Sequence, residues 1–158
     1  MGRPLEELKR LSTFREIGAN KMSSKHKNII EKFKLMINTN DYALAEELIS
    51  SDAVFQSLTS PEILHGGKGY LSVVEFMRKS FSDVHWDIED IAAEDKKIAV
   101  SWICSGTHDG DFMGISPTGK KFSFRCMNFY YLNDDDKIIK DVAAQGIAGL
   151  FESLGLKM

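Results

Sequence analysis

The hydrophobic positions change their spacing once along the chain, near residue 82. Before that point they recur every three to four residues, as expected of helices with one buried face. After it they alternate with polar residues, which is typical of half-buried strands. Helices followed by strands without helical crossovers predict an α+β fold with an antiparallel sheet, and they argue against a parallel doubly wound sheet.

Three helices are predicted in the first half. The first begins near Ser24, the second is capped by the polar break at residues 38–41, and the third follows a glycine-rich turn at residues 65–69. A short strand is predicted at residues 54–58. The residues expected to face inward are Ile29, Ile30, Phe33, Met36 and Ile37, then Leu44, Ala45, Leu48 and Ile49, then Tyr70, Val73, Val74, Met77 and Phe81.

Four long strands are predicted at residues 84–89, 98–105, 122–131 and 138–143. Polar turns at residues 94–97 and 133–137 predict hairpins, and a C-terminal helix is predicted at residues 147–154, ended by Gly155. The loop at residues 106–120 is long for a connection between strands. Loops of this length in compact domains are often functional.

The two faces of the third long strand differ in character. Asn128 is the strongly polar member of the even-numbered row, so it either bonds a neighbouring backbone group or water, or it binds a ligand oxygen in a cavity. The odd-numbered row is too apolar for water, which indicates a sheet-to-sheet homodimer or a C-terminal segment folded over it. The rows are Phe122, Phe124, Cys126, Asn128 and Tyr130, and Ser123, Arg125, Met127, Phe129 and Tyr131.

Composition and charge narrow the class of protein. Lys plus Arg is 20 and Asp plus Glu is 23, so a net charge of −3 predicts neither a nucleic-acid partner nor tight binding to an anionic membrane. No apolar run is long enough for a membrane span, no signal-peptide core is present, and a cytoplasmic location is expected. Cys104 and Cys126 are interpreted as buried, reduced strand thiols, with a bridge between neighbouring strands left open.

The chain divides into an N-terminal segment, residues 1–22, and one domain, residues 23–158. Leucines at helical spacing among charged residues predict a short amphipathic helix in the first segment. That helix is either a docking element or a leader from an upstream start codon.

The sequence contains few residues in known catalytic patterns. Phosphate-binding glycine loops, a nucleophile elbow and a Cys-x-x-Cys pair are absent from the sequence. His108 lies near Asp109 and Asp111, but this spacing is not a known ligand pattern, and no metal site is predicted.

Several stretches together resemble the SnoaL-like polyketide cyclases of the nuclear transport factor 2-like superfamily. They are Trp102, Gly106-Thr107-His108, Gly110, Phe112, Gly114-Ile115, Pro117-Thr118-Gly119-Lys120, Phe122-Ser123-Phe124-Arg125, Lys137-Ile138-Ile139 and the segment from Gly149 to Gly155. The likeness covers about residues 24–156. It implies a cone, in which a curved antiparallel sheet wraps around helices and an apolar pocket, and it implies association through the outer sheet face.

The resemblance also implies a reaction. The cyclases close a ring by an intramolecular aldol step on aromatic polyketide esters, without metal or cofactor, using a carboxylate base in a dry pocket. The position of their acid/base Asp falls at Ala143, whose methyl group cannot move a proton. A second polar position falls at Asn128. Asp141 shares the strand parity of Ala143, so it is either a displaced acid pointing into the cone or an edge carboxylate in solvent.

We therefore expect a cone that binds a small apolar or aromatic molecule. The candidate catalytic residues are Asp141 and His108, with no cofactor. The candidate ligand-binding residues are Asn128, Trp102, Phe55, Trp86, Phe124 and Tyr130, with His108 also expected in the pocket. The alternatives are a non-catalytic binder and a protein-interaction module on the same fold.

Overall fold

The computed structural model describes residues 24–56, 61–144 and 146–156. The predictions for residues 1–22 and for Leu58 fall outside these residues. In the described parts of the chain, no helix combines the length and apolar character needed to cross a membrane.

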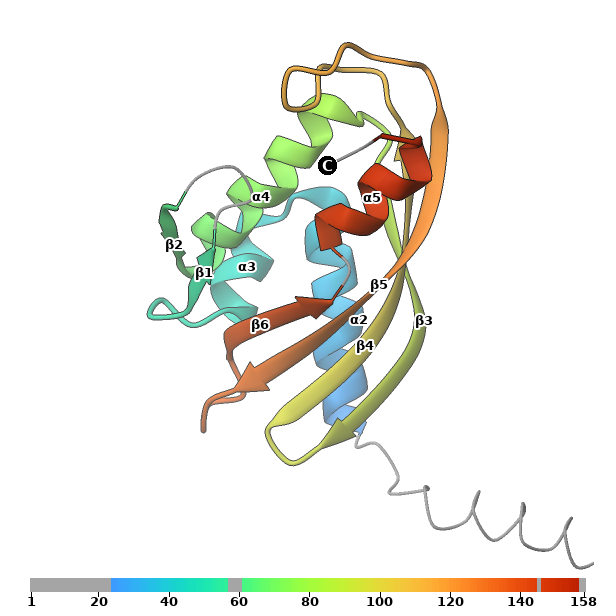
Figure 1. Cartoon of the computed structure of the whole chain (residues 1–158). Helices are drawn as coiled ribbons and strands as arrows, with labels where there is room; N and C mark the ends of the chain where they lie inside the picture. Colours follow the sequence, from blue (N-terminus) through green and yellow to red (C-terminus); the bar gives the residue numbers. More distant parts are fainter. Residues whose placement is uncertain (1–23, 57–60, 145, 157–158) are drawn as a thin grey trace, which may run out of the picture.

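The fold is α+β, as predicted, with helices packed on a curved antiparallel sheet (Figure 1). The sheet has the order β3-β4-β5-β6, and a two-stranded β1-β2 sheet stands apart from it. The helices are α2 (Ser24–Thr39), α3 (Tyr42–Leu48), α4 (Gly66–Ser80) and α5 (Gly146–Leu154). The strands are β1 (Val54–Gln56), β2 (Ile63–His65), β3 (His85–Glu94), β4 (Lys97–Thr107), β5 (Lys121–Leu132) and β6 (Ile138–Ala144).

The helix α2 lies in the hollow of the sheet because its apolar stripe matches the inward rows of the strands. Its inward residues, which include Phe33 and Met36, are buried as predicted. Asp41 caps α3 by accepting a hydrogen bond from the Leu44 backbone N–H at 3.0 Å. Figure 1 shows that the sheet bends around α2 and that α5 packs across one end of the sheet.

The start of α4 differs from the prediction. The helix begins at Gly66, where a turn was expected, and residues 63–65 form the short strand β2. Gly66 has a φ of +61°, which favours glycine, and a Cβ on Gly67 would lie 2.7 Å from the Ala45 backbone. The glycines therefore allow α4 to leave β2 abruptly and pack closely on α3.

Two β-bulges adjust the predicted alternation, one in β3 between Ile88 and Asp90 and one in β6. In β6 the pairing passes from Tyr131↔Lys140 to Leu132↔Ile138, so Ile139 is the extra residue. Strict alternation would place Ile138 on the face opposite Asp141. The bulge instead lets Ile138 be fully buried while Asp141 still points toward the helices.

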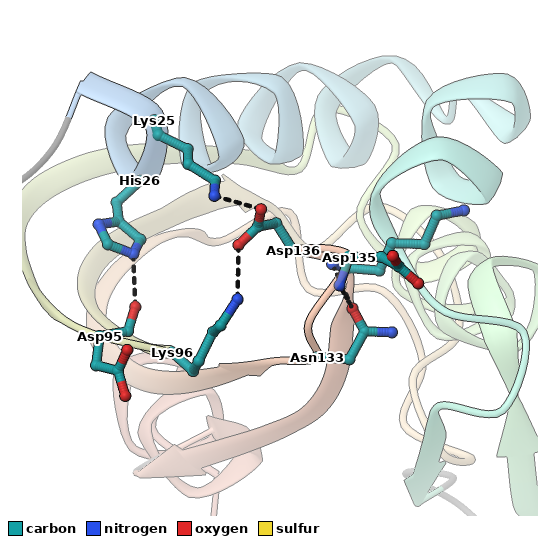
Figure 2. Close-up of polar contacts among 8 residues, drawn as sticks. Lys25, His26, Asp95, Lys96, Asn133, Asp135 and Asp136 are labelled. Carbon is teal, nitrogen blue, oxygen red and sulfur yellow. Dashed lines mark hydrogen bonds and ion pairs between the residues drawn. The ribbon is translucent and has the colours of Figure 1, made fainter.

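The two hairpin tips are tied to the start of α2 (Figure 2). Asp136 forms ion pairs with Lys25 of α2 and, at 3.1 Å, with Lys96 of the β3–β4 turn. His26 Nε2 is 2.8 Å from the Asp95 carbonyl oxygen. Both turns occur where they were predicted, and Asp95 and Asp136 adopt positive φ angles there. These contacts hold the first turn of α2 against the far end of the sheet.

Cys104 and Cys126 are free thiols on the neighbouring strands β4 and β5. Their partners in the register are Phe124 and Trp102, so the two cysteines are diagonal neighbours and not a directly opposed pair. The reduced interpretation of the pair therefore agrees with the structure.

Candidate active site

A cavity of about 400 Å³ lies between the inner face of the sheet and the helices α2, α4 and α5. Its volume falls in the range of small-molecule sites. Its walls are mostly apolar and aromatic. The lining residues are Ile37, Phe55, Tyr70, Val73, Val74, Met77, Trp86, Trp102, Cys104, Phe124, Cys126, Asn128, Tyr130, Asp141, Ala143 and Leu150.

All six candidate ligand-binding residues from the sequence line this cavity, and so does Asp141. Five of the six come from β3, β4 and β5, whose alternation had placed them on the inner face. Phe55 reaches the cavity from β1. The prediction that these side chains lie together therefore agrees with the structure.

Asp141 is held at two points. Asn128 Nδ2 donates to Asp141 Oδ1 at 2.7 Å, and the Tyr70 hydroxyl donates to Asp141 Oδ2 at 3.2 Å. Asn128 comes from the neighbouring strand β5 and Tyr70 from the first turns of α4. Each carboxylate oxygen thus receives one hydrogen bond, which fixes the plane of the carboxyl group and leaves further lone pairs for a ligand.

Burial raises the pKa of Asp141 from 3.8 to about 6. Taking the carboxylate out of water disfavours its charged form, and the hydrogen bonds from Asn128 and Tyr70 oppose this effect only in part. A carboxyl group with a pKa near 6 in an apolar cavity is able both to accept and to return a proton near neutral pH.

The other titratable groups of the cavity are neutral near pH 7. Burial raises the pKa values of Tyr70 and Tyr130 well above their usual range, and it raises the pKa of Cys126 to about 11. Burial raises the pKa of Cys104 as well. Asp141 is therefore the one side chain among the described lining residues that carries charge near pH 7.

Contacts with other aromatic side chains hold Tyr70 and Tyr130 in place. The Phe33 ring packs against Tyr70 and Tyr130, with centroid distances of 5.2 and 4.9 Å. Trp102 Nε1 donates to the Tyr130 hydroxyl at 3.1 Å. Phe33, Trp102 and Tyr130 are buried and Tyr70 packs against this cluster, so Tyr70 has little freedom to leave the carboxylate.

His108 is not where we expected it. The structure buries it completely outside the cavity, in a second apolar cluster, with its ring 5.5 Å from Phe81 and 6.5 Å from Phe112. Its Nδ1 is 3.0 Å from Thr118 Oγ1. The prediction of His108 as a pocket residue is corrected, because the loop at residues 108–120 turns away from the cavity to cover the end of α4.

The sequence did not predict the contact of Tyr70 with Asp141. Helical spacing had placed Tyr70 on the inner side of α4, but nothing in the pattern pairs it with a carboxylate 71 positions later.

Among the described residues, no three His, Cys, Asp or Glu side chains are grouped as metal ligands.

The model of the SnoaL-like polyketide cyclase family matches residues 27–151, which is most of the chain. The chain belongs to this family. No curated protein matches its sequence. For the SnoaL-like family, the α+β cone and its inward-facing strand rows are the expected architecture, and this member has both.

Solved structures share the fold at low sequence identity. TsrD from Streptomyces laurentii is 17% identical, with a TM-score of 0.73 over 87% of this chain and 100% of that one. IdmH from Streptomyces antibioticus is 24% identical, with a TM-score of 0.68 over 83% and 99%. A protein with a ketosteroid isomerase-like fold from Catenulispora acidiphila, solved in complex with trimethylamine, is 11% identical, with a TM-score of 0.65 over 82% and 93%.

Proposed function

We propose that this SnoaL-like protein is a cofactor-independent acid/base enzyme and that Asp141 is its base. The carboxylate takes a proton from the carbon next to a ligand carbonyl, so that the C–H bond breaks and its electron pair forms an enolate. The enolate carbon then attacks a second carbonyl of the same molecule, and the proton passes from Asp141 to the new alkoxide. The substrate is a small, mostly apolar or aromatic carbonyl compound.

The observation that carries the proposal is the environment of Asp141. It lines an apolar cavity, and burial raises its pKa to about 6. A general base is most effective when its pKa lies near the working pH, and such a base typically accelerates proton transfer by about 10²–10⁴-fold. An ordinary solvent-exposed aspartate has a pKa near 3.9 and is a much weaker base.

Asn128 and Tyr70 have supporting roles in this proposal. Both orient the carboxylate through the hydrogen bonds described above. An amide carries two N–H groups, and the bond to Asp141 uses one of them. The second suits the oxygen of a developing enolate, which gains more from a fixed donor in a dry site than it would in water.

Deuterium exchange tests the proposal without knowledge of the natural substrate. The protein is mixed with 2-tetralone in D₂O, and the loss of the protons next to the carbonyl is followed by NMR. We expect exchange above the buffer rate, rising with pH through about 6 as Asp141 ionises. Asp141→Asn should lower the protein-dependent rate at least about 100-fold.

Asp134→Asn is the matched control, because it removes one exposed carboxylate at a hairpin tip and leaves the cavity unchanged. The control should exchange at the wild-type rate. Exchange by the wild type that survives in Asp141→Asn would contradict the assignment of the base.

A second candidate function is ligand binding without catalysis. It is favoured by Ala143, which stands where the family resemblance places the acid/base Asp and which pairs across the sheet with Asn128. A binder of this kind would take up 2-tetralone or a similar ketone without exchanging its protons. The same NMR samples therefore separate the two functions.

The exposed apolar side chains on the outer face of the sheet support the proposal that the protein is a homodimer. Met127, Phe129 and Val142 point away from the cavity and are 52%, 47% and 42% exposed. Exposed apolar side chains grouped on one face usually mark an interface.

The free thiols of Cys104 and Cys126 support a cytoplasmic location, since reduced cysteines are the rule there.

A further inference from the structure

The charge of Asp141 is not compensated within the cavity. Its two hydrogen-bond partners, Asn128 and Tyr70, are neutral donors. Among the described lining residues there is no Lys, Arg or His. A buried carboxylate without a cationic partner is unfavourable, and the site is therefore electrostatically incomplete when Asp141 is ionised.

Two basic residues on the elements that form the cavity, Arg78 of α4 and Lys140 of β6, are engaged elsewhere. The Arg78 guanidinium lies 6.0 Å from the Trp86 ring centroid, but it is not a lining residue. Its N–H groups donate to three backbone carbonyls, those of Ile37, Asn38 and Val84. Lys140, the chain neighbour of Asp141, lies over the Tyr131 ring, 5.5 Å from its centroid. Neither charge neutralises the carboxylate.

Aromatic rings make up much of the remaining wall. Phe55, Tyr70, Trp102 and Tyr130 line the same cavity as the carboxylate. The faces of such rings attract organic cations, and the attraction is stronger in sites shielded from water. A carboxylate among aromatic rings is thus complementary to a positive charge surrounded by carbon.

The geometry points to a second ligand class for this cavity: small organic ammonium ions, with the nitrogen against Asp141 and its carbon substituents on the aromatic walls. An ammonium ion in this position covers the lone pairs that the proposed base needs, so it competes with a carbonyl substrate. The inference goes beyond the proposed function and does not depend on it, because it concerns binding and not proton transfer.

The pH dependence of this binding is set by Asp141. Of the other titratable lining groups, Tyr70, Tyr130, Cys104 and Cys126 remain neutral near pH 7, since burial raises the pKa of each. The helices α2 and α5 and the strand β1 contribute only apolar residues to the lining. A cation should therefore bind more tightly as the pH rises through about 6, and its binding should lower the pKa of Asp141.

Three probes of matched shape and different charge test the inference. They are benzyltrimethylammonium, which is a permanent cation, neopentylbenzene, which is its neutral carbon analogue, and benzylsulfonate, which is an anion of similar shape. Affinities are measured by calorimetry or NMR titration at pH 5 and pH 7.5. For the wild type at pH 7.5 we expect the cation to bind at least about tenfold more tightly than the neutral probe, and the anion more weakly than both.

Lower pH and Asp141→Asn should each remove the preference. At pH 5 the ratio of cation to neutral affinity should shrink severalfold, while the neutral probe binds as before. Asp141→Asn should bring the ratio within about threefold at both pH values, and Asp134→Asn should keep the wild-type ratio.

Equal affinities of the cation and the neutral probe for the wild type would overturn the inference, and this result needs no variant. A preference as large in Asp141→Asn as in the wild type would also overturn it. Failure of the deuterium-exchange experiment alone would leave these binding ratios unaffected, so the two proposals fail separately.

Discussion

Asn128 donates its side-chain N–H to Asp141 Oδ1 at 2.7 Å, across the neighbouring strands β5 and β6. The two residues are diagonal neighbours, because Asn128 pairs with Ala143 and Asp141 pairs with Tyr130. The bond draws the carboxylate over the inner face of the sheet and into the cavity. The same donor also limits how far burial raises the pKa of Asp141.

Removing this donor should make Asp141 a weaker acid. Asn128→Leu replaces the amide by an apolar group of similar size, so we expect the pKa of Asp141 to rise further above about 6. Tyr70→Phe should shift it in the same direction by a smaller amount, because the Tyr70 bond is longer and its effect is smaller. The midpoint of the pH–rate profile for deuterium exchange measures both shifts. An unchanged or lower midpoint in Asn128→Leu would contradict this account of the site.

The ionisation of Asp141 should cost folding stability. The folded-state pKa of about 6 lies above the unfolded value near 3.8, so the native state binds more protons than the unfolded state between these values. The free energy of unfolding therefore falls as the pH rises through this window. Relative to Asp141→Asn, the wild type should lose about 1–3 kcal/mol between pH 4 and pH 7.5.

Urea unfolding of both proteins at the two pH values measures this loss. The variant should be the more stable protein at pH 7.5, as is common where a function requires a strained or buried charge. If the stability difference between wild type and variant is the same at both pH values, Asp141 does not titrate as described.

His108 should be dispensable for exchange. Its ring packs in the second cluster, beside Phe81 and Phe112, and does not line the cavity. His108→Phe keeps an aromatic ring in this position. We expect its exchange rate with 2-tetralone to stay within about twofold of the wild type, because the reacting groups are untouched. A loss comparable to that of Asp141→Asn would restore His108 as a catalytic candidate.

A charge on the outer sheet face should disrupt the proposed homodimer. Phe129 lies in the exposed apolar group of β5 and β6, and Phe129→Glu would place a charge in the interface. Leu35→Glu is the control, because Leu35 is also exposed but lies on α2, away from this face. Light scattering after size exclusion should show a monomer for the first variant and a dimer for the second. A dimer that survives in Phe129→Glu would place the interface elsewhere.

The strand periodicity predicted much of the site. Asn128, Trp102 and Phe124 are inward because successive residues of a strand point to opposite faces, and this rule is local. The rule could not decide whether Asp141 points into the cone or lies in solvent at an edge. It identifies the face of a strand on which a residue lies, but not whether that part of the face is buried. The bulge at Ile139 depends on the partner strand and could not be read from alternation alone.

Long-range contacts account for what the sequence did not reveal. Tyr70 meets Asp141 across 71 positions of the chain through the tertiary packing of α4, and no local pattern encodes that contact. His108 lies in a loop without hydrophobic periodicity, so its direction is set by the cluster around Phe81. The short strand β2 was missed because its three residues are too few to show a period.

The pKa of the Asp141 carboxyl group is the quantity on which the proposed base and the pH dependence of the ammonium site both depend. It is measured directly by NMR, from the chemical shift of the side-chain carboxyl carbon of ¹³C-labelled protein across pH 3 to 9, with the signal assigned by its absence in Asp141→Asn. We predict a midpoint at about 6 for the ligand-free wild type. A midpoint below about 4, the range of an ordinary exposed aspartate, would contradict the account.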